Sequence, residues 1–381
     1  MITTDKNTSD TMLDCFEQVE TTKRHIGHTY SVGQALTITV LGLVCGLKNA
    51  SQIHQWSRDK RVGEFLAQHF GISQIPCYCW LLGLLKTVKP ESLSLCFSNW
   101  VASLMPENTG GTTISVDGKT IRFTGKMQRH KEPLHIVSAQ LAEMGMTFGQ
   151  KISQGAGGEI PAVRELLSSL QIKGCLVVAD ALHCQKESAQ TIVDAKADYL
   201  LNVKDNQKDL KAELADYLGD AALRAKMQCE SRVEKNRARV EERSAYVSGK
   251  TAWIHKGSDW PKLAVFGALH TRFTTAKGTS EQWHYYISSR KLTAAQLLHH
   301  ARMEWTVETM HWFLDVHFGE DFCRVEDENV QQNLNTARKI VLNGLKTYKL
   351  QTGSKKTVSQ IALDCLLDPQ HITDIVPFML K

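Results

Sequence analysis

The chain has 381 residues, a net charge of +5 and a hydrophobic fraction of 42%. This length predicts about two or three domains, and the composition is that of an ordinary globular protein. The longest apolar run, Ala35 to Leu47, is too short to span a bilayer, and the residues before it lack a signal-peptide pattern. These features argue against a membrane partner. The mild positive charge permits a nucleic-acid partner without requiring one.

The ten cysteines are irregularly spaced. Cys77 and Cys79 are separated by one residue, and no second pair completes a structural zinc site. Cys45 and Cys175 lie inside apolar runs, where a reduced thiol acts as a small hydrophobic side chain. We therefore expect reduced cysteines and a cytoplasmic location.

Apolar residues recur at helical spacing from about residue 31 to residue 104. Within this region, Glu64 to Ser73 has the helix, glycine and turn sequence of a helix-turn-helix DNA-binding motif. An ordinary helical hairpin with Gly71 as its C-cap has the same pattern. The sequence does not decide between the two.

A Gly/Thr-rich segment, Asn108 to Thr113, ends the helical region, and the hydrophobic period then changes to two. We expect strands at Thr113–Val116, Leu134–Leu141, Met146–Ile152, Cys175–Asp180 and Tyr199–Val203, and helices at Glu159–Leu170 and Gln185–Lys196. The second and third strands are predicted to form a hairpin. This mixed α/β order resembles the ribonuclease H-like arrangement, in which the first and fourth strands lie side by side.

Two of these strands end on an aspartate. Asp117 follows Ile114–Val116, and Asp180 follows Cys175–Ala179. A charged group beside a buried strand is costly unless it has a partner or a function. If the two strands are neighbours, both carboxylates meet at one edge, where they supply the oxygen ligands that Mg²⁺ prefers.

The region after the last predicted strand has a different pattern. A charged helical stretch, Asp205–Arg239, is predicted to lead into β-like segments at Ser244–Val247, Leu263–Thr274 and Glu281–Ser288. We interpret it as an insertion between the last core strand and a closing helix, Thr293–Phe318.

The closing helix carries a polar stripe. The stripe consists of Glu304, Glu308, His311 and Asp315, which fall on one helical face. A solvated charged face explains such a stripe equally well. The two upstream aspartates favour a functional role for one of these acids.

Five motifs together resemble the insertion-sequence transposases of the DDE class, of the H-repeat-associated type. They are SVDGK, VVADALHCQKE, NVKDNQ, HYYISSR and EWTVETMHWFLDVHFGEDFCRV. The resemblance extends from about residue 15 to residue 350. It implies a ribonuclease H-like catalytic core with a β-rich insertion, preceded by an all-α transposase-associated domain.

The resemblance implies that Asp117, Asp180 and Glu308 are the catalytic and metal-binding triad. It also implies two Mg²⁺ or Mn²⁺ ions per site, and endonuclease and strand-transfer chemistry on terminal inverted repeats and target DNA. A homodimer on DNA and a bacterial cytoplasmic, nucleoid-associated location follow from the same likeness. In the closing-helix motif Glu304 stands where the family has His, Val307 where it has Ile and Thr309 where it has Asn.

Two other functions remain open at this point. A catalytically inactive, DNA-binding relic is consistent with the altered motif residues. A glycoside hydrolase acting through a pair of carboxylates needs two acids and no metal. Such a hydrolase tolerates a chelator, whereas the relic binds DNA without nicking it.

Basic and aromatic residues around the motifs are candidates for DNA contacts. They are Lys119, Arg122, Lys126, Arg129, Lys204, Lys208, Arg237, Arg239, Arg243, Trp283, Arg302 and Trp312. Basic residues act on DNA as a group through counterion release, although each alone fits a plain surface role. Trp283 and Trp312 fit either stacking on an unpaired base or core packing.

We expect six segments. They are a polar N-terminal segment (1–30), a helical DNA-binding, transposase-associated domain (31–107), the first part of the catalytic core (108–206), a charged β-rich insertion (207–290), the part of the core with the Glu-bearing helix (291–350) and a C-terminal tail (351–381).

Overall fold

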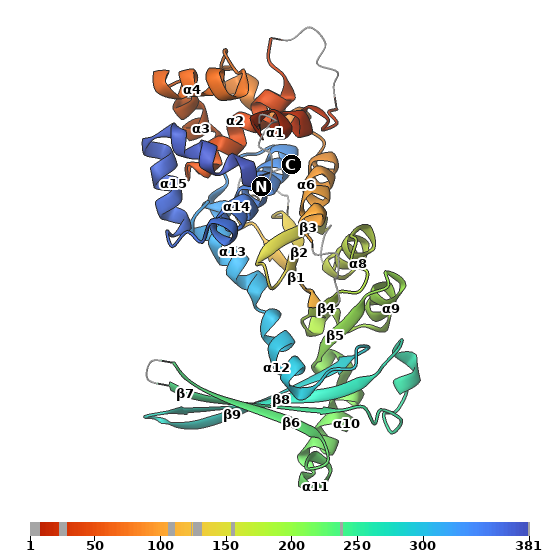
Figure 1. The fold of residues 1–381 in the computed structure, drawn as a ribbon. Helices are drawn as coiled ribbons and strands as arrows, with labels where there is room; N and C mark the ends of the chain where they lie inside the picture. The colour runs from red at the N-terminus through yellow and green to blue at the C-terminus, as the bar shows by residue number, and fades with distance from the viewer. Residues whose placement is uncertain are drawn as a thin grey trace, which may run out of the picture.

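A mixed β-sheet runs through the lower half of the molecule and is flanked by helices (Figure 1). The computed structural model describes residues 8–22, 29–105, 111–122, 124, 132–153, 157–236 and 239–379. Within these residues the strands follow the order β3-β2-β1-β4-β5-β9-β8-β7-β6. They are β1 (Thr113–Thr120), β2 (His135–Leu141), β3 (Met146–Ser153), β4 (Leu176–Ala179), β5 (Asp198–Val203), β6 (Gln228–Asn236), β7 (Arg239–Ser248), β8 (Val265–Thr275) and β9 (Gly278–Ser288).

The first five strands confirm the predicted mixed α/β core. β1 pairs antiparallel with β2 and parallel with β4, and β2 and β3 form the predicted hairpin. β4 continues in parallel to β5. The helices between these strands are α8 (Glu159–Ser169) and α9 (Lys186–Asp194). The first and fourth strands therefore lie side by side, as the ribonuclease H-like order requires.

The β-rich insertion continues the same sheet. β5 pairs antiparallel with β9, and β9, β8, β7 and β6 follow as successive antiparallel pairs. The prediction of a helical stretch over Asp205–Arg239 was only partly right. Two helices, α10 (Lys208–Gly219) and α11 (Ala221–Arg224), occupy its first half, and β6 occupies its second. The charged β6 becomes a strand because its backbone pairs with β7 from Gln228 to Asn236.

The predicted closing helix is two helices. α12 (Ala294–Met303) begins at Thr293 with a capping box to Gln296, and α13 (Thr306–Val316) follows after Glu304 and Trp305. The Thr306 hydroxyl donates to the Met303 carbonyl oxygen at 2.7 Å. This bond satisfies a carbonyl at the end of α12, where backbone acceptors lack helical partners.

Helices from both ends of the chain share one hydrophobic core. They are α1 (Thr8–Glu17), α2 (Val32–Val44), α3 (Ala50–Ser57), α4 (Lys60–Phe70), α5 (Tyr78–Thr87), α6 (Pro90–Ser103), α14 (Glu328–Thr352) and α15 (Val358–Leu367). α14 is buried over most of its length and packs against α2, α5, α6 and β3. Figure 1 shows this group of helices as the upper lobe.

Both terminal segments contain helices that the sequence analysis did not predict. The N-terminal segment, expected to be polar, contains α1, whose Met12 and Phe16 are buried in the core. The segment expected to be a C-terminal tail contains α15, whose Ile361 and Cys365 join the same core. In both cases widely spaced apolar residues on one helical face bury against other helices.

The candidate helix-turn-helix segment contains the end of α4. Gly71 has φ of +64° and caps this helix, as the helical-hairpin alternative requires. Residues 71–77 separate α4 from α5, which is longer than the turn of about three or four residues in a helix-turn-helix.

Among the described residues, no helix is both long enough and apolar enough to cross a membrane.

A carboxylate cluster as candidate metal centre

The two strand-borne aspartates lie next to each other. The parallel pairing of β1 with β4 ends at Val116 and Ala179, so Asp117 and Asp180 are the next residues on adjacent strands. Asp117 is not at the end of its strand as predicted, since β1 continues to Thr120 along β2. Asp180 does follow β4, and its carboxylate accepts the Leu182 N–H at 2.8 Å.

α13 runs alongside β1 and brings Glu308, His311 and Asp315 toward the aspartates. Three contacts join them: Ser115 to Thr306 through the hydroxyl oxygens at 3.2 Å, Asp117 Oδ2 to His311 Nδ1 at 3.5 Å, and the ion pair of Lys119 with Asp315. From Ser115 to Lys119 the strand rises about 13 Å, and from Thr306 to Asp315 the helix rises about 13.5 Å. The two elements therefore stay aligned over this length. Glu308, one turn before His311, therefore lies level with the Ser115–Asp117 part of β1.

The charges of the predicted triad interact. Burial raises the pKa of Asp117 to about 6, and the negative charges of Glu159, Asp180 and Glu308 act in the same direction. The backbone N–H of Gly118 opposes this rise by hydrogen bonding. The structure thus brings Asp117, Asp180 and Glu308 into one electrostatic cluster from three different elements.

Glu304 is a further acid of this cluster. Burial raises its pKa to about 7, and the nearby charges of Asp180 and Glu308 add to the effect. Lys204 and a hydrogen bond with Asn202 oppose it. The sequence placed Glu304 and Glu308 on one stripe of a single helix, but Glu304 lies at the end of α12 and Glu308 in the first turn of α13.

Sequence reasoning missed Glu159, the first residue of α8. Its carboxylate accepts hydrogen bonds from His135 Nε2 at 2.9 Å and from His183 Nε2 at 3.2 Å. The bonds from His135 and His183 lower its pKa to about 2, so it is ionised beside Asp117. The sequence shows only that Glu159 follows a glycine-rich stretch at the start of a predicted helix.

The donor set fits a hard divalent cation. Asp117, Asp180 and Glu308 offer carboxylate oxygens, the ligands that Mg²⁺ and Mn²⁺ prefer. Burial of Asp117 among like charges is unfavourable without a cation. The ammonium of Lys119, the nearest lysine on β1, is bonded instead to Asp315 and Glu320. These three carboxylates are therefore suitable ligands for a metal ion, and Lys119 pairs with Asp315 and Glu320 instead.

Three of the candidate DNA contacts, Lys126, Arg129 and Arg237, lie outside the described residues. Two others have largely covered side chains. Lys119 is 13% exposed in the ion pairs above, and Arg243 is 18% exposed and pairs with Glu234 and Glu241.

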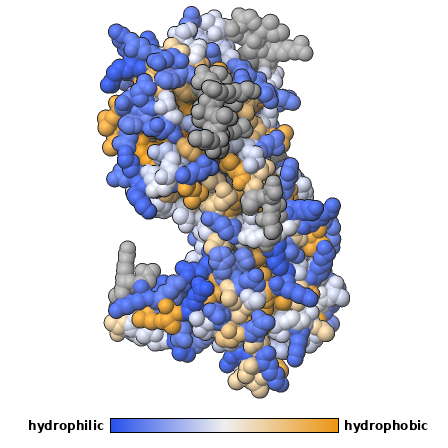
Figure 2. Space-filling model, in the orientation of Figure 1, coloured by the Kyte–Doolittle hydropathy of each residue, from blue (hydrophilic) through white to orange (hydrophobic). Residues whose placement is uncertain are grey.

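The remaining candidates lie in different settings. Arg122, Lys204, Lys208 and Arg239 are exposed, and Arg302 pairs with Glu234 at 2.6 Å. Trp312 is 59% exposed on α13. Trp283 stacks on His270 with ring centroids 4.3 Å apart and is partly buried against the core. Figure 2 shows a hollow on one side of the molecule, between the upper lobe and the projecting strands, with mostly hydrophilic residues around it.

A 3-2-1-4-5 core sheet with acids on its adjacent first and fourth strands places the protein in the ribonuclease H-like class. Residues 108–343 match the family model described as Transposase DDE domain, and residues 13–101 match the one described as DDE_Tnp_1-associated. The chain belongs to the DDE transposase family, which confirms the resemblance seen in its motifs.

Two relatives that are named as putative transposases are similar to this chain over most of its length. "Putative transposase YncI" of Escherichia coli O157:H7 is 29% identical over 88% of this chain and 87% of its own length. "H repeat-associated putative transposase YhhI" of Escherichia coli K12 is 27% identical over 88% and 90%. A piggyBac transposase synaptic complex with hairpin DNA is 10% identical, with a TM-score of 0.42 over 97% of this chain and 78% of that one. This TM-score is too low to support a conclusion about the fold.

Proposed function

We propose that this protein is an active DDE transposase that cleaves DNA at the ends of an insertion sequence and joins the freed end to target DNA. The observation that carries the proposal is the convergence of Asp117 on β1, Asp180 directly after β4 and Glu308 on α13 in a member of this family. Carboxylates gathered in this way serve divalent-metal chemistry on phosphodiesters.

In this proposal the carboxylates of Asp117, Asp180 and Glu308 would hold two Mg²⁺ or Mn²⁺ ions, with Asp117 contributing to both, Asp180 to one and Glu308 to the other. When bound, two such ions activate the attacking hydroxyl and stabilise the leaving oxygen. His311 keeps Asp117 in place through the 3.5 Å contact of Nδ1 with Oδ2. Burial lowers the pKa of His311 to about 3, so the ring is neutral and leaves the Asp117 charge available to metal.

The proposed partners are terminal inverted repeats and target DNA, bound by a homodimer in the bacterial cytoplasm. The exposed Arg122, Lys204, Lys208 and Arg239 supply phosphate contacts. The helical segment 31–107 is proposed as the domain that assists DNA binding, and 108–206 with 291–350 as the catalytic core around the insertion 207–290. The last segment, 351–381, completes the upper lobe.

A second candidate is a DNA-binding relic without catalysis. One observation favours it: Glu304 replaces the His of the family motif and places another acid beside Asp180. An extra negative charge in the cluster alters how the other carboxylates hold metal. Activity measurements separate the two candidates.

The test is nicking and strand transfer on a labelled fragment carrying the element's own end, with Mg²⁺ or Mn²⁺. Asp117→Asn, Asp180→Asn and Glu308→Gln preserve side-chain shape and are compared with Glu304→Gln. Asp209→Asn, in an exposed part of α10, is the matched control. We expect the three triad variants to lose at least about a hundredfold in rate, while Glu304→Gln and Asp209→Asn retain activity.

Each other outcome has a defined meaning. Loss in Glu304→Gln with activity kept in Glu308→Gln assigns the third ligand to Glu304. A wild-type protein that binds the fragment in a salt-dependent manner but does not nick it is the relic. Activity that persists in a chelator contradicts a metal-dependent mechanism altogether.

A further inference from the structure

Glu159 lies beside Asp117, and its carboxylate is bonded to two histidines. It is the first residue of α8, where the helix dipole favours a negative charge. Its Oε2 accepts from His135 Nε2 at 2.9 Å, and its Oε1 accepts from His183 Nε2 at 3.2 Å. Because each oxygen is bonded to a different histidine, this carboxylate links two separate parts of the chain.

His183 connects Glu159 to the turn that follows Asp180. This turn is a short 3-10 helix, Ala181–His183, and both kinds of Asp180 oxygen are bonded to it. The Asp180 carboxylate accepts the Leu182 N–H at 2.8 Å, and the Asp180 carbonyl oxygen accepts the His183 N–H at 3.2 Å. The His183 ring is buried, and its Nδ1 has no hydrogen-bond partner among the described residues. The bond from Nε2 to Glu159 therefore fixes this ring, and with it the turn.

His135 connects Glu159 to the strand that carries Asp117. It is the first residue of β2 and pairs with Thr120 of β1, and its Nδ1 lies 2.8 Å from the Thr120 hydroxyl oxygen. Gly118 leaves the space in which Glu159 lies against β1, since a Cβ at this position would be 2.6 Å from the Glu159 carboxylate. Glu159 is therefore held against β1 one residue from Asp117.

Asp180 depends on such support more than Asp117 does. Asp117 lies within β1 and is held by the pairing with β2, whereas β4 ends one residue before Asp180. The direction of Asp180 is therefore set by the turn that follows it. Asn206 holds this turn from the side of β5, by donating to the Ala181 carbonyl oxygen at 2.5 Å. Glu159 holds it from the side of α8.

We propose that Glu159 is a positioning residue that sets the separation of Asp117 and Asp180 by acting through His135 and His183. This inference rests on the proposed function, in which both aspartates hold metal. Mg²⁺ demands near-ideal octahedral geometry, so its ligands must keep their mutual distance. Groups that support metal ligands from outside typically change metal affinity by about 10–100-fold when they are removed.

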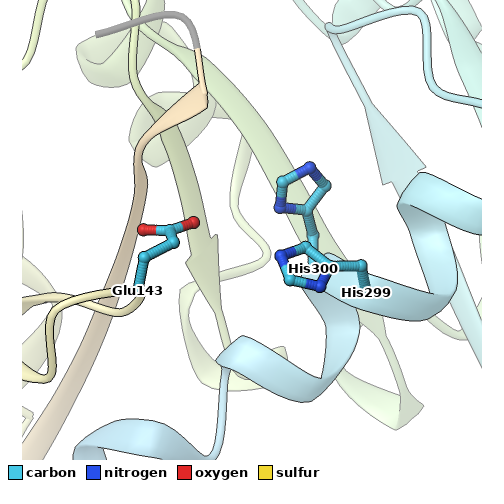
Figure 3. A group of neighbouring side chains, drawn as sticks. All are labelled: Glu143, His299 and His300. Atoms are coloured by element: carbon cyan, nitrogen blue, oxygen red, sulfur yellow. The ribbon is translucent and has the colours of Figure 1, made fainter.

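A comparable carboxylate and histidine group at the start of β1 provides a control. Glu143, in the turn between β2 and β3, lies near His299 and His300 of α12 (Figure 3). Glu143 accepts the Thr113 N–H at 2.9 and 3.0 Å, and His300 Nδ1 lies 2.9 Å from the Thr113 hydroxyl oxygen. This hydrogen-bond network is four strand residues from Asp117, or about 13 Å along β1.

The main test removes the hydrogen bond to Glu159 without removing the Glu159 charge. His183→Gln can place an amide N–H where Nε2–H lies, whereas His183→Leu has a similar size and no donor. Mn²⁺ binding to the full-length protein is measured by calorimetry without DNA. We expect His183→Leu to weaken binding by about tenfold or more, and His183→Gln to remain within about threefold of wild type. Asp117→Asn/Asp180→Asn identifies the binding that belongs to the aspartates.

Glu159→Gln tests the same link from its other end. It should weaken Mn²⁺ binding and raise the Mn²⁺ concentration for half-maximal nicking by about tenfold, with the rate at saturating Mn²⁺ nearly unchanged. Glu143→Gln removes a carboxylate from the comparable network and should change neither quantity. Near-UV circular dichroism checks the fold of each variant. If His183→Leu loses its native signal, Glu159→Gln against Glu143→Gln decides the result.

The outcomes distinguish this inference from the proposed function. Equal Mn²⁺ affinity in wild type, His183→Leu and Glu159→Gln overturns the positioning role and leaves the proposed function intact. Equal weakening in His183→Leu and His183→Gln also overturns it, because ring packing rather than the hydrogen bond then matters. A wild type that binds Mn²⁺ through the aspartates but does not nick DNA contradicts the proposed function alone. Mn²⁺ binding that is independent of Asp117 and Asp180 overturns both.

Discussion

Gly118 makes room for the acid that neighbours Asp117. A Cβ at this position would lie 2.6 Å from the Glu159 carboxylate and 2.6 Å from His135 Nε2. We predict that Gly118→Ala displaces Glu159 from its histidine partners and costs about 1–2 kcal/mol of stability. Gly83→Ala in α5, where nothing lies within 4 Å, is the control and should stabilise by about 0.5–1 kcal/mol.

Urea unfolding of the two variants measures both effects. Equal changes in stability for Gly118→Ala and Gly83→Ala would show that the contact of β1 with Glu159 is not tight.

Lys339 is a buried cation whose protonation should make stability depend on pH. It lies on α14 and donates to Ser138 Oγ at 2.9 Å and to Gln150 Oε1 at 2.5 Å. Burial lowers its pKa to about 8, whereas the unfolded chain keeps a value of about 10.4. Between these two values the unfolded state binds more protons, so the contribution of Lys339 to stability rises with pH.

The predicted signal is a difference between wild type and Lys339→Met. From pH 7.5 to pH 10, wild type should gain up to about 2–3 kcal/mol relative to the variant. Urea unfolding at several pH values measures this difference, in which the titration of all other groups cancels. Lys355→Met, at an exposed lysine, should give a flat difference. A flat difference for Lys339→Met as well would mean that its ammonium is well solvated.

Within the candidate site, the pattern of apolar strand residues predicted only the two aspartates, each of which follows a strand-like run. Asp117 and Asp180 each follow a short apolar run, so the pattern and the parallel topology together place them side by side. The role of Glu159 depends on how α8 packs beside β1, which leaves no periodic signal. Lys119 looked like a phosphate contact because its partners Asp315 and Glu320 are distant in sequence.

A bulge in the β2–β3 hairpin depends on one side chain of α14. The pairing shifts between Ala139 and Gln140, so that Phe148 has no partner on β2, and the adjacent Thr147 bonds to α14 through its backbone. Asn343 accepts the Thr147 N–H at 3.0 Å and donates to its carbonyl oxygen at 2.7 Å. A single amide therefore satisfies both backbone groups of a buried residue.

We predict that Asn343→Leu destabilises the protein by about 2–4 kcal/mol, because a buried donor and a buried acceptor both lose their partner. Asn329→Leu in the first turn of the same helix, where the half-buried amide makes one bond of 3.3 Å, should cost less than about 0.5 kcal/mol. Chemical unfolding of the two variants gives the comparison. Similar costs at both positions would indicate that water replaces Asn343 at the bulge.

At the scale of elements, the sequence predicted well wherever hydrophobic period and length agreed. The core strands are short and rich in β-branched residues, and their order was predicted correctly. β6 was missed because its charged sequence gains strand structure from pairing with β7 rather than from local preference. The break between α12 and α13 was missed because apolar spacing continues across Glu304 and Trp305.

The whole molecule is held together by a helix from the end of the chain. α14 packs against α2, α5 and α6 and also contacts β3, so the N-terminal helices and the sheet share its core. Its Val330, Leu334, Ile340 and Leu345 are buried. Each of these side chains contributes about 1.5–3 kcal/mol when buried.

We predict that a chain of residues 108–381 does not fold by itself, although it contains the entire sheet. Removing α1 to α6 exposes the apolar part of α14 that packs against α2, α5 and α6. Near-UV circular dichroism should lack a native signal, and the fragment should bind a hydrophobic dye.

The full-length chain should unfold by calorimetry in a transition that couples the upper lobe to the sheet. A folded, monomeric 108–381 fragment would contradict this prediction. The N-terminal helices would then form an independent domain, and the buried polar face of α14 would have to tolerate water. Because this helix carries Asn343, the Asn343→Leu variant should lower the Tm of the upper lobe and of the sheet together. Separate shifts of two transitions would show that α14 does not couple them.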